Sequence, residues 1–196
     1  MEITNLNQLD VANGVYTYAD YLLWKLKERV ELFRGKIFAM SPAPSTKHQR
    51  ISKNLNGELY LFFKGKTCQL FAAPFDVRLP KQSKKNEQIY TVVQPDLCII
   101  CEPNKLDERG CIGAPDLIIE ILSPGNSKKE MKDKFELYQE AGVREYWIVH
   151  PADENILIFV LENGKYHSLP PIVRGDKANS AIFSNLIIDT EDIFSE

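Results

Sequence analysis

Three acidic residues lie in or beside two apolar segments, where charged side chains are uncommon. Asp96 opens the segment DLCIIC, and Asp116 and Glu120 lie within APDLIIEIL. Carboxylates are rarely buried unless they pair with a cation or bind a metal. Because side chains alternate along a strand, Asp116 and Glu120 share one face. If the two segments pair as strands, Asp96 and Glu120 can reach one point and could hold Mg²⁺, which takes one or two protein carboxylates together with water.

Each acid also has a structural interpretation. Asp96 fits a strand-end or turn acid as well as it fits a metal ligand. Asp116 follows Pro115, and we favour the interpretation that it simply begins its strand. Glu120 has apolar neighbours on both sides, so it is the acid that points most clearly to a site.

The helix expected after these strands directs a lysine toward them. Met131, Phe135 and Tyr138 have helical spacing and should face the sheet. Lys134 belongs to the same side, and Lys128 lies near that side at the helix start. A lysine in this position indicates a charge partner among the strand acids, although a lysine that extends past the core to solvent would have the same spacing.

The elements that position these residues follow from apolar periodicity and turn residues. The first half predicts a helix from about Thr17 with a Thr17–Asp20 capping box, followed by a hairpin in VELFRGKIFAM that turns at Arg34-Gly35. A second helix is expected after SPAPSTKHQR; it ends at Gly65 and has an apolar stripe of Ile51, Leu55, Leu59 and Phe62. A strand is expected over 68–79. The basic segment PKQSKKNEQ is typical of a loop.

The second half alternates strands and a helix in the same way. It predicts strands over 96–101 and about 116–122, and then a helix from a Ser127–Glu130 capping box to about Ala141. A strand in REYWIVH, a hairpin that turns at Asn163-Gly164, and a last strand with a short helix follow. This order of elements predicts an α/β fold, with a mixed β-sheet flanked by helices.

Composition limits the class of protein. The chain has 196 residues, which suits one domain over 1–196 with a core at about 17–194. No apolar run approaches the ~20 residues of a membrane span, and the N-terminus lacks the features of a secretory signal, so we expect a cytoplasmic protein with no membrane partner. The net charge of −3 argues against a broad, charge-driven nucleic-acid coat, but it does not exclude a nuclease with a metal at its acidic centre.

The four cysteines do not indicate a zinc site. Cys98 and Cys101 form a CxxC, but positions three apart in a strand point to opposite faces. Cys68 and Cys111 are single, and no second CxxC exists. We therefore expect all four to be reduced and to pack as small hydrophobic residues.

Beyond these patterns, the chain resembles a known family. Asp96, the EIL triplet at Glu120 and the segment GAPDLIIEILSP…KFELYQEAGVREYWIVHP resemble the PD-(D/E)XK nuclease superfamily. Within it, the segment 113–151 is similar to a bacterial restriction-endonuclease-like family formerly known only as a domain of unknown function. The resemblance covers about 17–194 and implies a restriction-endonuclease-like αβββαβ core with a metal-dependent phosphodiesterase site.

The resemblance also implies roles for individual residues. Asp96 would match the first acid of the motif and Glu120 the second, so both would be catalytic metal ligands. Glu31, in VELFRG, matches an N-terminal acid that many such nucleases place near the metal, although an outward-facing hairpin residue is an equal alternative. His48 matches a family feature in SPAPSTKHQR, but at a helix start we expect a surface or capping group.

One departure from the motif concerns its lysine. This lysine should stand two positions after the second acid, where the chain has Leu122. Other members of the superfamily recruit it from the next helix, so Lys134 is the first candidate and Lys128 the second. If neither reaches the site, the chain would be an inactive relative of the nucleases.

The expected activity is that of a metal-dependent endonuclease. Asp96, Glu120 and the backbone carbonyl of Ile121 would hold Mg²⁺, with Mn²⁺ as a substitute, and Lys134 would orient the attacking water. The expected partner is nucleic acid, DNA before RNA. A homodimer fits an enzyme that cuts both strands.

Alternatives to this activity stay open. A domain of the same fold that binds nucleic acid without cutting it, or a structural domain, would share these features. The loop lysines, Lys81, Lys84 and Lys85, could contact phosphates but fit a solvated loop better.

Overall fold

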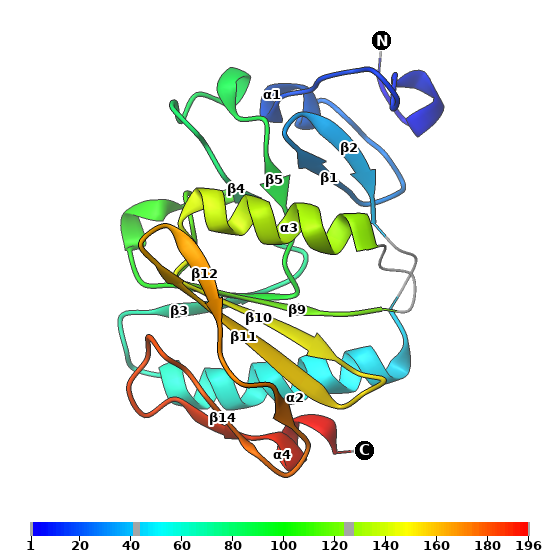
Figure 1. The fold of residues 1–196 in the computed structure, drawn as a ribbon. Coiled ribbons are helices and arrows are strands. Elements are labelled where there is room, and N and C mark those ends of the chain that lie inside the picture. Colours follow the sequence, from blue (N-terminus) through cyan, green and yellow to red (C-terminus); the bar gives the residue numbers. More distant parts are fainter. Residues whose placement is uncertain (1, 41–43, 124–127, 196) are drawn as a thin grey trace.

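Two β-sheets with a helix between them form the framework of the molecule (Figure 1). The computed structural model describes residues 2–40, 44–123 and 128–195. In the larger sheet the strands follow the order β12-β11-β10-β9-β6-β3, and β13 also pairs with β11. The smaller sheet has the order β2-β1-β5-β4-β8-β7. The fold is therefore α/β with mixed sheets flanked by helices, as the sequence predicts.

The central part of the larger sheet has the αβββαβ arrangement. Its elements are α2 (Thr46–Phe63), β3 (Gln69–Ala72), β6 (Leu97–Ile100), β9 (Leu117–Ile121), α3 (Lys128–Ala141) and β10 (Glu145–His150). The pairs β3–β6 and β6–β9 are antiparallel, whereas β9 and β10 are parallel. The connection through α3 supplies the crossover that a parallel pair requires.

The two faces of this sheet are covered by different helices. The α2 stripe of Ile51, Leu55 and Leu59 packs on Ile119 and Trp147 on one face. On the other face, buried side chains of α3 meet residues of β6, β9 and β10: Leu137, Tyr138, Cys98, Ile118 and Tyr146. Both helices start near the end of β9 (Figure 1), so residues in their first turns lie close to Glu120.

The chain after β10 extends the larger sheet and closes the core beside α2. Its elements are β11 (Asn155–Glu162), β12 (Lys165–Ser168), β13 (Ile172–Val173), β14 (Lys177–Asn179), β15 (Ile187–Asp189) and α4 (Thr190–Phe194). The hairpin between β11 and β12 turns at Asn163-Gly164, where both residues have positive φ (50° and 76°), as the sequence predicts.

The smaller sheet lies on the far side of α3 from the larger one. Its strands are β1 (Val30–Phe33), β2 (Lys36–Ala39), β4 (Val77–Arg78), β5 (Val92–Val93), β7 (Leu106–Asp107) and β8 (Gly110–Ile112). Short helical turns flank it: η1 (Leu6–Gln8), α1 (Tyr18–Tyr21), η2 (Asn86–Gln88) and η3 (Pro103–Lys105). The predicted β1–β2 hairpin at Arg34-Gly35 is confirmed.

Two predicted elements differ from the structure. The helix from Thr17 has the predicted capping box but ends at Tyr21, so it is too short for an extended apolar face. The single strand over 68–79 is instead divided between β3 and β4, which belong to different sheets. Pro74 lies between them and has no N–H to continue a ladder. The Ser127 part of the second predicted capping box lies outside the described residues.

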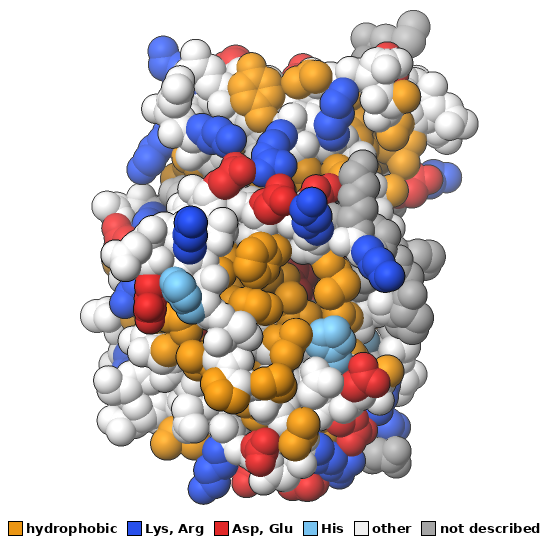
Figure 2. Space-filling view, viewed as in Figure 1, with side chains coloured by type: hydrophobic (Ala, Val, Ile, Leu, Met, Phe, Trp, Pro, Cys, Tyr) orange, Lys and Arg blue, Asp and Glu red, His pale blue; other side chains and the backbone are white. Residues whose placement is uncertain are grey.

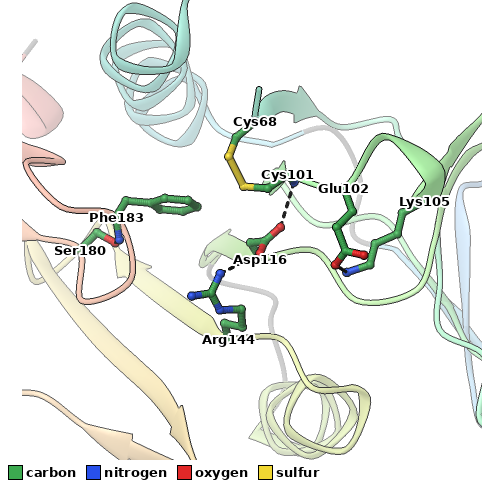
Figure 3. The surroundings of a disulfide bond; sticks show 8 residues. All are labelled: Cys68, Cys101, Glu102, Lys105, Asp116, Arg144, Ser180 and Phe183. Carbon is green, nitrogen blue, oxygen red and sulfur yellow. Dashed lines mark hydrogen bonds and ion pairs between the residues drawn. A yellow bond between two sulfur atoms is a disulfide. The ribbon is translucent and has the colours of Figure 1, made fainter. Parts of the chain in front are cut away.

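The prediction that all four cysteines are reduced is wrong for two of them. Cys68 and Cys101 form a disulfide (Figure 3). Cys68 directly precedes β3 and Cys101 directly follows β6, so the antiparallel register Gln69↔Ile100 brings the two side by side. Cys98 and Cys111 are free and buried. Cys98 and Cys101 do lie on opposite faces of the sheet, as their spacing predicts.

Among the described residues, no helix combines the length and the apolar character that a membrane span requires.

Candidate active site

Asp96 and Glu120 come together because β6 and β9 are antiparallel neighbours. Asp96 directly precedes β6, and the pair Leu97↔Ile119 places it beside the Glu120 end of β9. The Oδ2 atom of Asp96 accepts a hydrogen bond of 2.7 Å from the backbone N–H of Ile121. This bond fixes the carboxylate against β9, next to the second acid.

Glu120 is 7% exposed and is held by two donors from α3. Its Oε1 atom accepts hydrogen bonds from Lys134 Nζ at 2.9 Å and from the Tyr138 hydroxyl at 2.6 Å. The donors are four positions apart, so they project from one side of the helix. No described residue donates a hydrogen bond to Oε2, which leaves this oxygen available to a ligand.

Glu31 reaches the same lysine from the smaller sheet. It is 2% exposed, and its Oε1 lies 3.3 Å from Lys134 Nζ and accepts a hydrogen bond of 2.8 Å from the backbone N–H of Gln94. Lys134, on the helix between the sheets, thus bridges an acid from each of them. The outward-facing alternative for Glu31 is excluded by its burial.

Two acids beside one ammonium group, with Asp96 as a third acid near Glu120, set the electrostatics of the site. Burial alone would lower the pKa of Lys134, but Glu120 and Glu31 outweigh it and raise this pKa, so the lysine stays charged. Burial raises the pKa of Glu120. The charge of Lys134 lowers this pKa, whereas the charges of Asp96 and Glu31 raise it further. Burial and Glu120 raise the pKa of Tyr138 well above 10.0, so its hydroxyl remains a hydrogen-bond donor. A divalent cation would relieve the excess negative charge.

A cavity of about 90 Å³ opens onto these groups. Its lining includes Asp96, Glu120, Ile121, Lys134, His48 and Arg29, whereas Glu31 lies behind Lys134 and is not in the wall. In the space-filling view, acidic atoms are visible at the bottom of a recess among apolar side chains (Figure 2). The apolar part of the lining includes Leu122, Met131 and Tyr146. The volume is sufficient for a metal ion with a few waters.

The donor groups in this cavity fit a hard divalent cation. Two carboxylates and the Ile121 carbonyl offer oxygen atoms, the ligands that Mg²⁺ prefers, and water would complete the shell. Among the described residues, no three His, Cys, Asp or Glu side chains form a group suited to a metal. Mg²⁺ usually keeps several of its waters, so these residues fit a largely hydrated ion.

The structure brings the four candidate residues together, but with different exposure to the cavity. Asp96, Glu120 and Lys134 contribute to its wall, and Glu31 supports Lys134 from behind. Lys128 is exposed at the start of α3 and does not line the cavity, so of the two lysine candidates Lys134 reaches the acids.

Asp116 belongs to the opposite end of β9, as the strand-start interpretation predicts. Its two oxygens accept hydrogen bonds from Cys101 N–H at 2.9 Å and from Arg144 Nη1 at 3.0 Å (Figure 3). Both oxygens are therefore already occupied. Its role is to join the start of β9 to the end of β6 and the start of β10 rather than to contact the cavity.

The expectation that His48 is a surface or capping group is wrong. It is 6% exposed, lines the cavity, and places Nε2 3.4 Å from Asp96 Oδ1. Burial opposes its charge, but the hydrogen bond and charge of Asp96 raise its pKa overall. A signal existed in the sequence, because His48 continues the apolar stripe of α2 at three positions before Ile51.

The sequence alone assigns no role to two further residues of the cavity. Gln94 and Arg29 each lie two positions before a candidate acid, Asp96 and Glu31 respectively. The Gln94 side-chain oxygen accepts hydrogen bonds from Arg29 Nε at 3.0 Å and Nη2 at 2.6 Å. Period-two spacing in a strand could have suggested Arg29, but only the packing of the two sheets places it at this cavity.

The lysines of the basic loop lie on the protein surface. Lys81 pairs with Glu140 at 3.1 Å, and Lys84 and Lys85 are exposed. None of the three contributes to the lining of the cavity. This arrangement agrees with the solvated-loop alternative.

Comparisons with known proteins agree with this architecture. The chain matches the family Uma2, described as "Putative restriction endonuclease", over residues 18–191. A crystal structure described as a "putative nuclease belonging to DUF820" from Anabaena variabilis ATCC 29413 superposes with a TM-score of 0.71, at 21% identity, over 92% of this chain and 98% of that chain. At this identity, the likeness establishes the fold.

A curated relative matches part of the chain. The uncharacterized protein slr1290 of Synechocystis sp. (strain ATCC 27184 / PCC 6803 / Kazusa) is 30% identical over 121 residues, which are 61% of this chain and 60% of the relative. The match therefore spans less than two thirds of either protein. The family match covers most of the chain, including all four candidate residues, and confirms the resemblance read from the sequence: the chain belongs to the Uma2 family of restriction-endonuclease-like proteins.

Proposed function

We propose that the protein is a metal-dependent nuclease that hydrolyses phosphodiester bonds, with DNA as its substrate. The observation that carries the proposal is the position of Glu120, which is buried against Lys134 while it lines a cavity shared with Asp96. A buried acid with a neighbouring cation and a free oxygen is typical of a catalytic position. The family description supports the reaction class and the choice of DNA.

In this proposal, Asp96, Glu120 and the Ile121 carbonyl hold Mg²⁺ or Mn²⁺. The ion, when bound, supplies a more acidic water and offsets charge on the phosphate. Lys134 stays protonated, orients the attacking water and donates to a phosphate oxygen. Glu31 lies behind Lys134, so we assign it the positioning of that ammonium group rather than direct metal binding.

Other features of the proposal follow from the same reaction. One catalytic cavity cuts one strand, so cleavage of duplex DNA on both strands would require a homodimer or two successive encounters. We further propose that 1–196 forms a single domain and that the protein acts in the cytoplasm, where its DNA substrate lies.

A second candidate function is binding of nucleic acid without cleavage. Leu122 lines the cavity at the position where the superfamily motif has its lysine. If Lys134 cannot replace that lysine chemically, the fold would retain affinity and lose hydrolysis. Cleavage assays separate the two functions.

The test uses purified protein with plasmid DNA, DNA oligonucleotides and RNA oligonucleotides, each with Mg²⁺, Mn²⁺ or EDTA. We expect cleavage with metal and at least a hundredfold loss in Glu120→Gln, because one carboxylate oxygen of the metal site becomes an amide. Asp116→Asn is the matched control, since it changes an acid on the same strand face outside the cavity. Equal background rates for wild type and Glu120→Gln would refute the enzymatic function.

A further inference from the structure

Arg29 directly precedes β1 and lies at the mouth of the catalytic cavity. Its side chain is exposed, and it is the one arginine in the described lining of that cavity. Two of its N–H groups, on Nε and Nη2, donate to the side-chain oxygen of Gln94 at 3.0 and 2.6 Å. The guanidinium group is thus fixed in orientation although it faces solvent.

The partner of Arg29 is itself held from three directions. Gln94 donates through Nε2 to Asp76 Oδ1 at 2.9 Å and to the Tyr21 hydroxyl at 3.1 Å, and its backbone N–H donates to Glu31. Because Nε2 is committed to these acceptors, the amide oxygen must face Arg29. The arginine is therefore pre-organised by a neutral group, before any ligand arrives.

The charge of Arg29 is not neutralised by this contact. Four other arginines, Arg34, Arg78, Arg144 and Arg174, each pair with a carboxylate. Arg29 has no carboxylate within ion-pair distance among the described residues, and its contact is to an uncharged amide. A fixed, uncompensated cation beside a cavity attracts anions.

The remaining hydrogen-bond donors of Arg29 indicate which kind of anion it would bind. A guanidinium group has five N–H donors, and Gln94 accepts from two of them. Among the described residues none accepts from the other three, which can contact an oxyanion. Arginine matches phosphate in a planar, two-point geometry. The cavity behind Arg29 contains the acids and lysine to which we assign phosphodiester cleavage.

We propose that Arg29 binds a backbone phosphate of a nucleic-acid strand lying across the cavity mouth, and that Gln94 is its positioning residue. This inference rests on the proposed function for the class of ligand, but not for catalysis. It assigns to Arg29 the contact that registers the strand over Asp96 and Glu120. The contact is to the backbone, so it carries no base specificity.

The experiment measures binding and cleavage separately, in the full chain. Binding of a fluorescein-labelled DNA oligonucleotide is followed by anisotropy in EDTA, where no cleavage can occur, at several salt concentrations. The variants are Arg29→Ala, Arg29→Lys and Arg109→Ala. Arg109 is the matched control, because it is an exposed arginine in the β7–β8 turn at the opposite edge of the same sheet.

For Arg29→Ala we expect the Kd to rise about tenfold, since hydrogen bonds to charged groups are typically worth that much. The salt dependence of binding should fall by about one phosphate contact. Arg29→Lys should keep the salt dependence while its Kd rises, because it retains the charge without the planar fork. Arg109→Ala should match wild type within about twofold. In cleavage assays, Arg29→Ala should raise KM more than it lowers kcat.

The outcomes distinguish this inference from the proposed function. If wild type binds DNA without cutting it and Arg29→Ala loses affinity, the inference stands and the proposed enzymatic function fails. If wild type cuts DNA and Arg29→Ala behaves like Arg109→Ala in Kd and KM, the inference is overturned and the enzyme stands. Absence of any salt-dependent binding by wild type overturns both. Should Arg29→Ala fail to fold, an unchanged Kd in Arg29→Lys overturns the two-point contact.

Discussion

The two ends of the β6–β9 strand pair carry acids of the same kind in opposite chemical situations. At one end, Asp116 has both oxygens occupied by Cys101 N–H and Arg144, beside the Cys68–Cys101 disulfide (Figure 3). At the other end, Glu120 and Asp96 share a cavity and the acids outnumber the cations. Asp116 and Glu120 are four positions apart and share one face of the strand, so their spacing alone does not show which of them belongs to a functional site.

The difference lies in how completely each carboxylate is satisfied. Asp116 lies outside the cavity and both of its oxygens accept hydrogen bonds, so it stabilises the ends of neighbouring elements and offers no position to a ligand. An acid that is buried with one free oxygen, beside other acids, keeps that capacity and gains from a cation. Variants that change one end but not the other test whether the Glu120 end (the proposed catalytic end) and the Asp116 end (the structural end) differ in this way.

The largest expected effect is that of removing the lysine between the two sheets. Lys134→Ala leaves Glu31 and Glu120 as buried charges without a cation, which should cost about 3–5 kcal/mol of unfolding free energy. Metal-dependent cleavage should be lost as well. Arg144→Ala at the other end should cost about 1 kcal/mol or less, because that side chain is 57% exposed. Urea unfolding of both variants checks the difference.

A charge-neutral version of the same site provides the control. The triple variant Lys134→Met, Glu31→Gln, Glu120→Gln removes the cation and both of its acids together, so no uncompensated charge remains. It should recover much of the stability that Lys134→Ala loses, while staying inactive. If Lys134→Ala is as stable as wild type, the account of the three groups as one buried ion cluster is wrong.

The disulfide gives the next largest effect, at the structural end. It closes a loop with a sequence separation of 33, and loss of such a crosslink typically costs about 2–4 kcal/mol. The Cys68→Ser, Cys101→Ser double variant should therefore unfold at lower urea concentration. Its cleavage rate at ordinary temperature should equal that of wild type, because the crosslink lies at the far end of β6 from Asp96. A large loss of activity without loss of stability would contradict the separation of the two ends.

Much of this comparison was open to prediction from the sequence. The αβββαβ order followed from the family resemblance and from periodicity. Helical spacing alone placed Lys134 on the correct side of α3. The sequence also showed that Asp96 and Glu120 could meet if their two strands paired, and the strands do pair. His48 was also within reach, because it continues the α2 stripe.

The rest required knowledge of which distant segments become neighbours. The disulfide depends on the register of β3 with β6, and the single strand expected over 68–79 concealed the break that sets this register. Arg29 and Gln94 gain their roles only when the smaller sheet packs across α3. Non-local pairings of this kind are not encoded in any short window of sequence.

A smaller effect is expected from neutralising the structural acid. Asp116→Asn keeps the shape but turns one acceptor oxygen into an NH₂ group, which must face either the Cys101 N–H or Arg144. The unsatisfied donor should cost about 1–3 kcal/mol of unfolding free energy. Cleavage should be unchanged. If this variant instead loses metal-dependent cleavage, both ends of the strand pair would contribute to the reaction, and the distinction drawn between them would not hold.

The most gradual expected effect, spread over the interval between two pKa values, is a change of stability with pH at the catalytic end. In the metal-free protein, the pKa of Glu120 is raised above its ordinary value of 4.5, chiefly by burial. The folded state therefore binds more protons than the unfolded state above pH 4.5, so this group lowers the unfolding free energy as pH rises through the interval between the two pKa values. In Glu120→Gln the side chain cannot ionise, so this loss of unfolding free energy with rising pH does not occur.

The stability of Glu120→Gln relative to wild type should thus increase with pH, by an amount on the order of 1 kcal/mol per pKa unit. Urea unfolding in EDTA from about pH 5 to about pH 8 measures this difference. Lys134 does not interfere, because its pKa is raised from 10.5 and it stays charged throughout. The raised pKa of Glu145 is common to both proteins and cancels. A difference that is constant with pH, or that falls, would mean that Lys134 fully compensates Glu120, and the catalytic end would then resemble the Asp116 end.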